Sequence, residues 1–140
     1  MTVVENSVEI ARPPEVAFDY LSDMRNELKW NPDCQRMEKV TDGPVGLGTR
    51  FRAKWRASGV VEAECLRYDR PRGWTYLNGG PVEVRLDVDL TPTPAGTRLV
   101  SRFDAKPRGW FHLVFPIFLL VIRRQEKTNM ANAKRAVEAL

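Results

Sequence analysis

The chain has few of the residues from which metal sites, disulfide frameworks and catalytic triads are built. Among 140 residues there are one histidine, His112, and two cysteines, Cys34 and Cys65, which do not form a Cys-x-x-Cys pair. Two thiols and one imidazole do not complete a usual structural zinc site, so we expect no metal, and two reduced cysteines in strands are a simpler interpretation than a disulfide. The Gly-x-Ser-x-Gly, His-Glu-x-x-His, P-loop and Gly-x-Gly-x-x-Gly patterns are absent, so the sequence predicts no cofactor and no catalytic residue.

Long runs of one kind of residue are also missing. The 22 basic and 18 acidic residues are interspersed, and a net charge of +4 without a basic cluster does not predict a nucleic-acid partner. The N-terminus shows no basic segment followed by an apolar run, so we expect no signal peptide. The longest apolar segment, residues 110–122, is shorter than the roughly 20 residues of a membrane-spanning helix. We therefore expect one cytoplasmic domain over residues 1–140.

Alternation of apolar and polar residues predicts a chain rich in strands. In residues 49–58, Phe51, Ala53, Trp55 and Ala57 point to one side and four basic residues point to the other. The following strand has two glutamates on its polar side, and we expect them to pair with these basic residues on the outer surface of the sheet rather than to act in catalysis. Strands are expected over residues 2–11, 34–43, 49–58, 60–69, 74–78, 82–90 and 97–105.

Two short helices are expected after the first strand. Residues 13–23 begin with a Pro-Pro pair, which fits a first helical turn, and then follow a 3.6-residue apolar period. Asp23 is placed to cap a second helix over residues 24–30, in which Met24 and Leu28 would face the core.

The apolar segment and the polar tail after it predict a long last helix. Pro116 favours a separate turn over residues 109–115 and a continuous helix from about Ile117. The apolar face of this helix repeats every three or four residues and consists of Met130, Ala133, Val137 and Leu140. Consecutive hairpins give an antiparallel sheet, and only this helix is long enough to cover it. The sequence therefore predicts an α+β fold with the helix on one face of the sheet.

Several segments resemble one protein family. They are IARPPEVAFDYLSD (10–23), MRNELKWNPDCQRMEKV (24–40), DGPVGLGTRF (42–51) and the final helix, and together they cover nearly the whole chain. In this order they resemble the SRPBCC superfamily (START-like, polyketide cyclase/dehydrase-type), which has the helix-grip fold. The resemblance implies a curved antiparallel sheet of about seven strands around a long C-terminal helix, with two short helices after strand 1. It also implies a deep cavity for lipids, sterols, polyketides or similar molecules. The superfamily includes carriers, cyclases, hormone receptors and ring-hydroxylase subunits, so the fold does not choose among these functions.

The inward residues of the strands and the start of the last helix are the candidates for the wall of this cavity, although the same residues could fill a solid core. Tyr76, Ser101 and Gln125 are polar groups that could orient a ligand, and Asn129 follows Gln125 by one helical turn. The predicted apolar wall consists of Phe51, Trp55, Val61, Ala63, Cys65, Val84, Leu86, Val88, Leu99, Phe103, Phe118, Leu119 and Ile122.

The first half of the apolar segment has more large apolar residues than one helix face can bury. Trp110, Phe111, His112 and Phe115 are therefore candidates for a cavity entrance or a peripheral membrane contact. Alternatively, these residues form a dimer seam or pack within the protein's own core. The sequence is compatible with a monomer and with a homodimer. No motif pairs His112 with a nucleophile or with a second metal ligand. We therefore expect His112 to be a surface residue rather than a general acid or base.

Three functions remain open from the sequence. The first is the binding or transport of a hydrophobic small molecule, and the second is a polyketide cyclase- or dehydratase-type enzyme. The third is a module that docks on a membrane or a partner through residues 110–118. The lack of a catalytic motif does not exclude the enzyme, because in cyclases of this resemblance the cavity shape and a few polar groups do much of the work.

Overall fold

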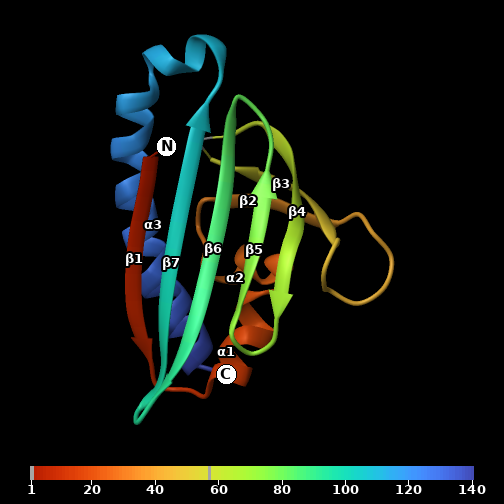
Figure 1. The fold of residues 1–140 in the computed structure, drawn as a ribbon, viewed down its shortest axis with the longest axis vertical. Coiled ribbons are helices and arrows are strands. Elements are labelled where there is room, and N and C mark those ends of the chain that lie inside the picture. Colours follow the sequence, from red (N-terminus) through yellow and green to blue (C-terminus); the bar gives the residue numbers. More distant parts are fainter. Residues whose placement is uncertain (1, 57) are drawn as a thin grey trace.

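Seven strands form one antiparallel sheet, and a layer of helices covers one of its faces (Figure 1). The computed structural model describes residues 2–56 and 58–140. The helical elements are α1 (Pro14–Leu21), the 3-10 turn η1 (Met24–Asn26), α2 (Glu27–Trp30), the 3-10 turn η2 (Gly109–Leu113) and α3 (Phe115–Glu138). The strands are β1 (Thr2–Ile10), β2 (Cys34–Lys39), β3 (Arg50–Trp55), β4 (Val60–Asp69), β5 (Gly73–Asn78), β6 (Val82–Thr93) and β7 (Gly96–Pro107). The predicted α+β class, with short helices after strand 1 and a long C-terminal helix, is confirmed.

The strand order in the sheet is β1-β7-β6-β5-β4-β3-β2. Strands β2 to β7 follow one another as consecutive hairpins, as the sequence predicts. The first strand joins the far edge by pairing with the last one, so that Val4 lies opposite Phe103 and Val8 lies opposite Leu99. This pairing places β1 beside α3, which encloses the covered face of the sheet from that edge (Figure 1).

The helices lie where their caps and prolines allow them to begin. Pro116 lies in the first turn of α3, where the missing N–H breaks no helical hydrogen bond, and the helix therefore begins at Phe115 rather than after the proline. The expected separate turn before it is η2. The carboxylate of Asp23 accepts a hydrogen bond from the backbone N–H of Arg25 at 3.1 Å. Asp23 therefore caps η1, and its predicted role as a helix cap is confirmed. Both α1 and α2 contact α3 on the covered face of the sheet.

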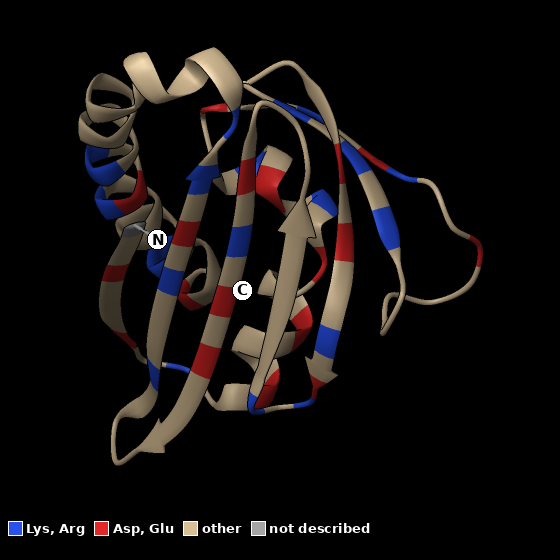
Figure 2. Cartoon of the chain, turned by 45° about the horizontal axis from the view of Figure 1, so that its top comes forward, with Lys and Arg blue, Asp and Glu red and all other residues tan. Residues whose placement is uncertain are grey.

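Charged residues alternate with buried ones along β3 and β4, and Arg50, Arg52, Glu62 and Glu64 are exposed on the outer face of the sheet. Figure 2 shows how charged residues recur along the strands. In the β3–β4 pair, Arg52 is opposite Glu62 and Arg50 is opposite Glu64. The guanidinium of Arg50 also lies 3.7 Å from the carboxylate of Glu62. The predicted cross-strand pairing of basic and acidic residues is confirmed, and exposed pairs of this kind contribute at most about 1 kcal/mol each.

A closed aromatic core fills part of the space between α1 and the sheet. Phe18 of α1 is fully buried, and its ring meets Trp74 at 5.3 Å and Tyr68 at 5.0 Å, edge to face in both pairs. Phe51 meets Tyr76 in the same way at 5.9 Å. Such aromatic pairs contribute about 0.5–1.5 kcal/mol each beyond the burial of their area. This core fixes α1 on the sheet and leaves the neighbouring space, between the sheet and α3, to be bounded by other side chains.

Several predicted strand boundaries were wrong, among them the end of β3, which lies at Trp55 rather than at residue 58. The turn expected over residues 91–96 is much shorter, because Pro92 pairs with Thr97 and Thr93 pairs with Gly96, which extends both β6 and β7. Strand β2 ends at Lys39 rather than at residue 43. The expected inward position of Ala57 lies outside the described residues.

Two predicted inward positions on the helices were also wrong. Leu28 is 50% exposed, because the tighter 3-10 turn before α2 changes the phase of the helical period. Leu140 is exposed, because α3 ends at Glu138. Ala133 and Val137 of the same predicted face are buried.

Candidate functional site

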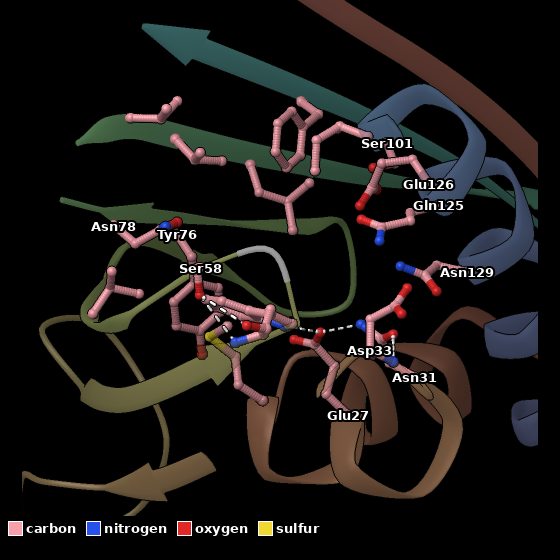
Figure 3. A pocket seen from close by; sticks show the side chains of 18 of the residues that line it. Glu27, Asn31, Asp33, Ser58, Tyr76, Asn78, Ser101, Gln125, Glu126 and Asn129 are labelled. Atoms are coloured by element: carbon pink, nitrogen blue, oxygen red, sulfur yellow. Dashed lines mark hydrogen bonds between the residues drawn. The ribbon is translucent and has the colours of Figure 1, made fainter. Parts of the chain in front are cut away.

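A cavity of about 240 Å³ lies between the sheet and the helices (Figure 3). Strands supply alternate residues to it, because only every second side chain of a strand points to the covered face. From α3 it receives residues spaced by three and four, which share one side of a helix. The apolar part of the wall consists of Leu21, Met24, Trp30, Trp55, Val61, Trp74, Val82, Val84, Leu86, Val88, Leu99, Phe103, Phe111, Phe118, Ile122, Met130 and Ala133.

Polar side chains gather where α2 and the loop after it face α3. Glu27, Asn31 and Asp33 come from the first segment, and Glu126 and Asn129 come from α3. Figure 3 shows these two groups pointing toward each other across the cavity. Gln125 lies beside Glu126. We call this set of six residues the polar end of the cavity.

Glu27 is held in place by two donors. Its Oε1 accepts the indole N–H of Trp55 at 2.9 Å and the side-chain amide of Asn31 at 2.8 Å. The carbonyl oxygen of the Asn31 side chain in turn accepts the backbone N–H of Asp33 at 3.0 Å. Burial raises the pKa of Glu27, and the two hydrogen bonds oppose that shift in part. The indole of Trp55 thus orients a carboxylate as well as lining the cavity.

Glu126 faces Glu27 from α3, and its pKa is raised above that of an ordinary glutamate. Burial between α3 and the sheet raises its pKa to about 7, and the negative charges of Glu27 and Asp33 add to the shift, whereas a hydrogen bond from Asn129 opposes it. Glu126 keeps some accessible surface, which faces the cavity. The side-chain Oδ1 of Asn129 is buried without a hydrogen-bond partner among the described residues. The polar end therefore holds acceptors that the protein itself does not satisfy.

Charge in the cavity has one sign. Glu27, Asp33 and Glu126 line it, whereas no lysine, arginine or histidine is among its described lining residues. The guanidinium of Arg56 lies 3.5 Å from the carboxylate of Asp33, but Arg56 is exposed outside the cavity. An enclosed carboxyl group with a raised pKa in a concave apolar site is a common mark of a functional site.

The hydroxyl of Tyr76 is already used by the protein. It donates to the backbone carbonyl of Ser22 at 2.8 Å, and burial raises the pKa of this phenol. Tyr76 lies on the cavity wall, as do Ser101 and Gln125. Of these three polar residues suggested by the sequence, Gln125 adjoins Glu126 on α3, whereas Tyr76 is drawn away from the acidic groups (Figure 3).

The structure places most of the predicted wall on the cavity. The residues that line it as expected are Trp55, Val61, Val84, Leu86, Val88, Leu99, Phe103, Phe118 and Ile122.

Four predicted wall residues do not line the cavity. Phe51, Ala63 and Cys65 do face the covered side of the sheet, but the closed core encloses them, with Tyr76 against Phe51 and opposite Cys65. Leu119 of α3 is half-buried and is not among the described residues that line the cavity. The thiol of Cys65 has a raised pKa because of its burial, which makes it a poor nucleophile.

Three acidic residues of the site, Glu27, Asp33 and Glu126, were missed from the sequence. Glu126 follows Ile122 by four residues and precedes Asn129 by three, so the helical period could have placed it on the inner face. Glu27 carries no comparable signal, because α2 is only one turn long and its direction depends on how the loop after it packs.

The four residues proposed for the entrance have different environments. Phe111 lines the cavity, and Phe115 packs against Phe118 with ring centroids 6.0 Å apart. Trp110 is 70% exposed, and His112 is also exposed, with its Nδ1 3.0 Å from the carbonyl of Gly109. Phe111 and Phe115 thus belong to the inner side of this segment, and Trp110 and His112 belong to its outer side.

The outer side of this segment is a patch of large apolar residues. We define the apolar tip as Trp110, Leu113, Ile117 and Leu120, of which Leu113 is 84% exposed and Leu120 is 69% exposed. No charged residue occurs in η2 or in the first two turns of α3, and basic residues follow immediately after (Figure 2). Within the described residues, no helix is both long and apolar enough to cross a membrane.

Comparison with known proteins gives a consistent result for the fold. The sequence matches the family described as "Polyketide cyclase / dehydrase and lipid transport" over residues 1–138. No curated protein matches it.

Similar solved structures share the whole architecture at low sequence identity. TTHA0849 from Thermus thermophilus is 17% identical with a TM-score of 0.79, and the alignment covers 99% of this chain and 98% of that one. The Zhui aromatase/cyclase from Streptomyces sp. R1128 is 17% identical with a TM-score of 0.78, covering 98% and 93%. Ara h 8.0201 is 17% identical with a TM-score of 0.74, covering 99% of both chains. At these identities the likeness shows the helix-grip fold and no more.

Proposed function

Because the chain belongs to the polyketide cyclase/dehydrase and lipid transport family, we propose that it binds and carries an apolar small molecule in the cavity between the sheet and α3. The resemblance stated from the sequence is thereby confirmed as a family assignment. The observation that carries the proposal is the cavity itself, with its almost continuous wall of aliphatic and aromatic side chains.

The size of the cavity restricts the kind of ligand. Its volume of about 240 Å³ lies just below the roughly 300–1,000 Å³ of typical ligand pockets. A slender alkyl chain or a molecule of one or two rings suits this volume better than an extended polyketide. Side chains around an empty apolar space lose dispersion contacts that a ligand would restore, so occupancy by an apolar body is favourable.

A substitution that fills the cavity tests this proposal. Leu86 lies in the middle of the β6 wall, and Leu86→Trp would occupy the space with an indole. We expect the affinity for the neutral fluorophore N-phenyl-1-naphthylamine to fall by about tenfold or more, measured by fluorescence titration. The matched control is Leu66→Trp, which makes the same change at an exposed position of β4. Equal binding by both variants would contradict the proposal.

An enzyme of the cyclase or dehydratase type is the second candidate, and Glu126 is the observation that favours it. A carboxyl group with a pKa of about 7 can both donate and accept a proton near neutral pH. This role requires that Glu126→Gln abolishes turnover of a cyclisable substrate while leaving its binding intact. If turnover persists in that variant, this carboxyl is not the acid or base.

The apolar tip suggests how a carrier of this kind would load. We propose that it inserts into the surface of an anionic bilayer, because Arg123 and Arg124 follow Leu120 by three and four residues, about one helical turn, and are exposed. Phe111 and Phe118 connect the same segment to the cavity wall. An apolar ligand could then pass between the bilayer and the cavity with little contact with water.

Vesicle sedimentation tests this contact. Ile117→Asp combined with Leu120→Asp should reduce binding to vesicles of equal parts phosphatidylcholine and phosphatidylserine by more than about tenfold. The control is Leu47→Asp, which alters an equally exposed leucine in the loop before β3. Wild-type protein that stays in the supernatant would contradict the membrane contact. If it also sediments as a dimer in analytical ultracentrifugation and the double variant is a monomer, the tip is a dimer seam.

A further inference from the structure

The free hydrogen-bonding capacity of the polar end consists largely of acceptors. Three donors near it are already committed, since the indole N–H of Trp55 and the amide of Asn31 both donate to Glu27, and the hydroxyl of Tyr76 donates to Ser22. The side-chain amide of Gln125 can both donate and accept. What remains includes the carboxyl group of Glu126 and the buried, unpaired Oδ1 of Asn129. Buried acceptors without donors cost free energy, so a ligand that brings a donor would be favoured.

The sign of the charge also discriminates between ligands. Glu27, Asp33 and Glu126 are the charged or ionisable acids that face the lumen, and the described lining residues include no basic side chain to neutralise an anion. A ligand carboxylate placed there would face the carboxyl groups of Glu27 and Glu126 in a site of low effective dielectric, with no basic partner among the described lining residues. An ammonium group in the same place would be attracted by both.

The polar and apolar parts of the cavity are separated, which fixes an orientation. The acidic groups come from α2, the loop after it and α3, whereas Val84 of β6, Phe103 of β7 and Phe118 of α3 pack together in a separate apolar cluster. An amphipathic molecule would therefore place its head between the two helices and its apolar body along β6 and β7. One head group and one slender body are what a cavity of this size can hold.

We propose that the polar end selects ligands whose head group donates hydrogen bonds, namely an alcohol or a protonated amine, and that it rejects ligands that end in a carboxylate. The inference rests on the proposed binding function and specifies the class of ligand for the same cavity. The group that sets the choice is the Glu126 carboxyl, with Glu27 as its fixed counterpart across the cavity.

Three probes with the same decyl chain test the selectivity. Decylamine, 1-decanol and decanoate differ only in the head group, and each is used to displace N-phenyl-1-naphthylamine at pH 8, below the concentration at which it forms micelles. We expect decylamine and 1-decanol to bind at least about tenfold more tightly than decanoate. Glu126→Gln should reduce the advantage of decylamine over 1-decanol and improve the binding of decanoate.

Two further variants make the result specific. Glu27→Gln keeps the oxygen that accepts from Trp55 and Asn31, and it should change the order of the probes in the same direction as Glu126→Gln. Glu64→Gln removes one negative charge from the outer face of β4 and should leave the order unchanged. If Glu27→Gln does not fold, as judged by circular dichroism, Glu126→Gln decides the question alone.

The pH provides an independent readout. The titratable groups that act on Glu126 are Glu27 from α2 and Asp33 from the following loop, while Gln125 and Asn129 flank it on α3. Since the pKa of Glu126 is about 7, its protonation at pH 6 should narrow the gap between decylamine and decanoate in the wild type but not in Glu126→Gln.

The outcomes separate this inference from the proposed function. If decanoate binds the wild type as tightly as the other two probes, or if Glu126→Gln leaves the order unchanged, the selectivity is refuted and the binding function stands. If N-phenyl-1-naphthylamine and all three probes fail to bind the wild type, the binding function itself is refuted.

Discussion

The two ends of α3 use apolar residues in opposite ways. Near its start, Ile117 is 68% exposed, whereas near its end Val137 is fully buried, on the part of the helix that lies against β1 and α1. Between them, Ile122, Glu126 and Asn129 face the cavity. One continuous helix therefore serves as a surface contact, a binding wall and a structural core element in turn. Hydrophobicity alone does not distinguish these three roles. They differ in what each turn of the helix faces, which is solvent, the cavity or the protein core.

The largest loss of stability is expected when a charge is introduced at the buried end of α3. Val137→Asp places a carboxylate in a fully buried apolar site. We expect a loss of about 4 kcal/mol or more in the free energy of unfolding, measured by urea denaturation. A loss below about 1 kcal/mol would mean that the end of α3 is not part of the core.

Replacing Glu126, in the middle of α3, by a neutral residue should increase the free energy of unfolding. The pKa of Glu126 is raised from 4.5 to about 7, so the folded protein binds this proton more tightly than the unfolded chain. The stability that this group contributes is fully present below pH 4.5 and is lost as the pH rises through about 7. Glu126→Gln should therefore be more stable than the wild type at pH 8, by at most about 3 kcal/mol, since water in the cavity reduces the effect.

The comparison across pH is the control for this prediction. At pH 4.5 the two proteins should unfold at similar urea concentrations, and the difference should grow between pH 4.5 and pH 8. Glu64→Gln, on the outer face, should show no such growth. A constant difference between wild type and Glu126→Gln at all pH values would contradict the raised pKa.

A smaller effect is expected at the last turn of α3. The guanidinium of Arg12 donates to the carbonyl of Leu140 at 2.7 Å and lies 3.5 Å from the carbonyl of Val137. A cation at the C-terminal end of a helix also interacts favourably with the helix dipole. Arg12→Ala should reduce the free energy of unfolding by about 1 kcal/mol in urea denaturation. Arg12→Lys should recover part of that loss, and no loss in either variant would show that the contact is incidental.

The smallest change in stability is expected at the exposed start of the helix. Ile117→Asp should alter the free energy of unfolding by less than about 0.5 kcal/mol, because the side chain leaves no core contact behind. Thermal unfolding of this variant beside Val137→Asp compares the two ends of α3 directly. A large loss in Ile117→Asp would mean that the apolar tip supports the fold rather than a contact with another surface.

The architecture could be predicted from the sequence because it depends on local periods. Alternation in segments such as residues 82–90 marks the inner face of each strand, and the three- and four-residue spacing of Ala133 and Val137 marks the inner face of α3. The charged outer face followed from the same alternation, as the pairing of Arg52 with Glu62 shows. These features require only neighbours along the chain or in adjacent strands.

The candidate site could be predicted only in part, because it depends on contacts between distant segments. Alternation identifies Phe51 and Leu86 equally as inward residues, but Tyr76 encloses the first and the second faces an open space. Glu27 joins Glu126 through the packing of a one-turn helix, which no period in the sequence describes. The acidic character of the cavity is therefore a property of the tertiary structure.

Native mass spectrometry of the protein as purified, followed by solvent extraction of whatever it carries, tests the central claim most directly. The cavity predicts a noncovalent adduct on the wild type and on Leu66→Trp that is missing from Leu86→Trp, and an extract that contains an amphiphile with an alcohol or amine head group. A wild type that is free of adduct and gains none when mixed with decylamine, 1-decanol or decanoate would contradict the claim that this cavity is a binding site.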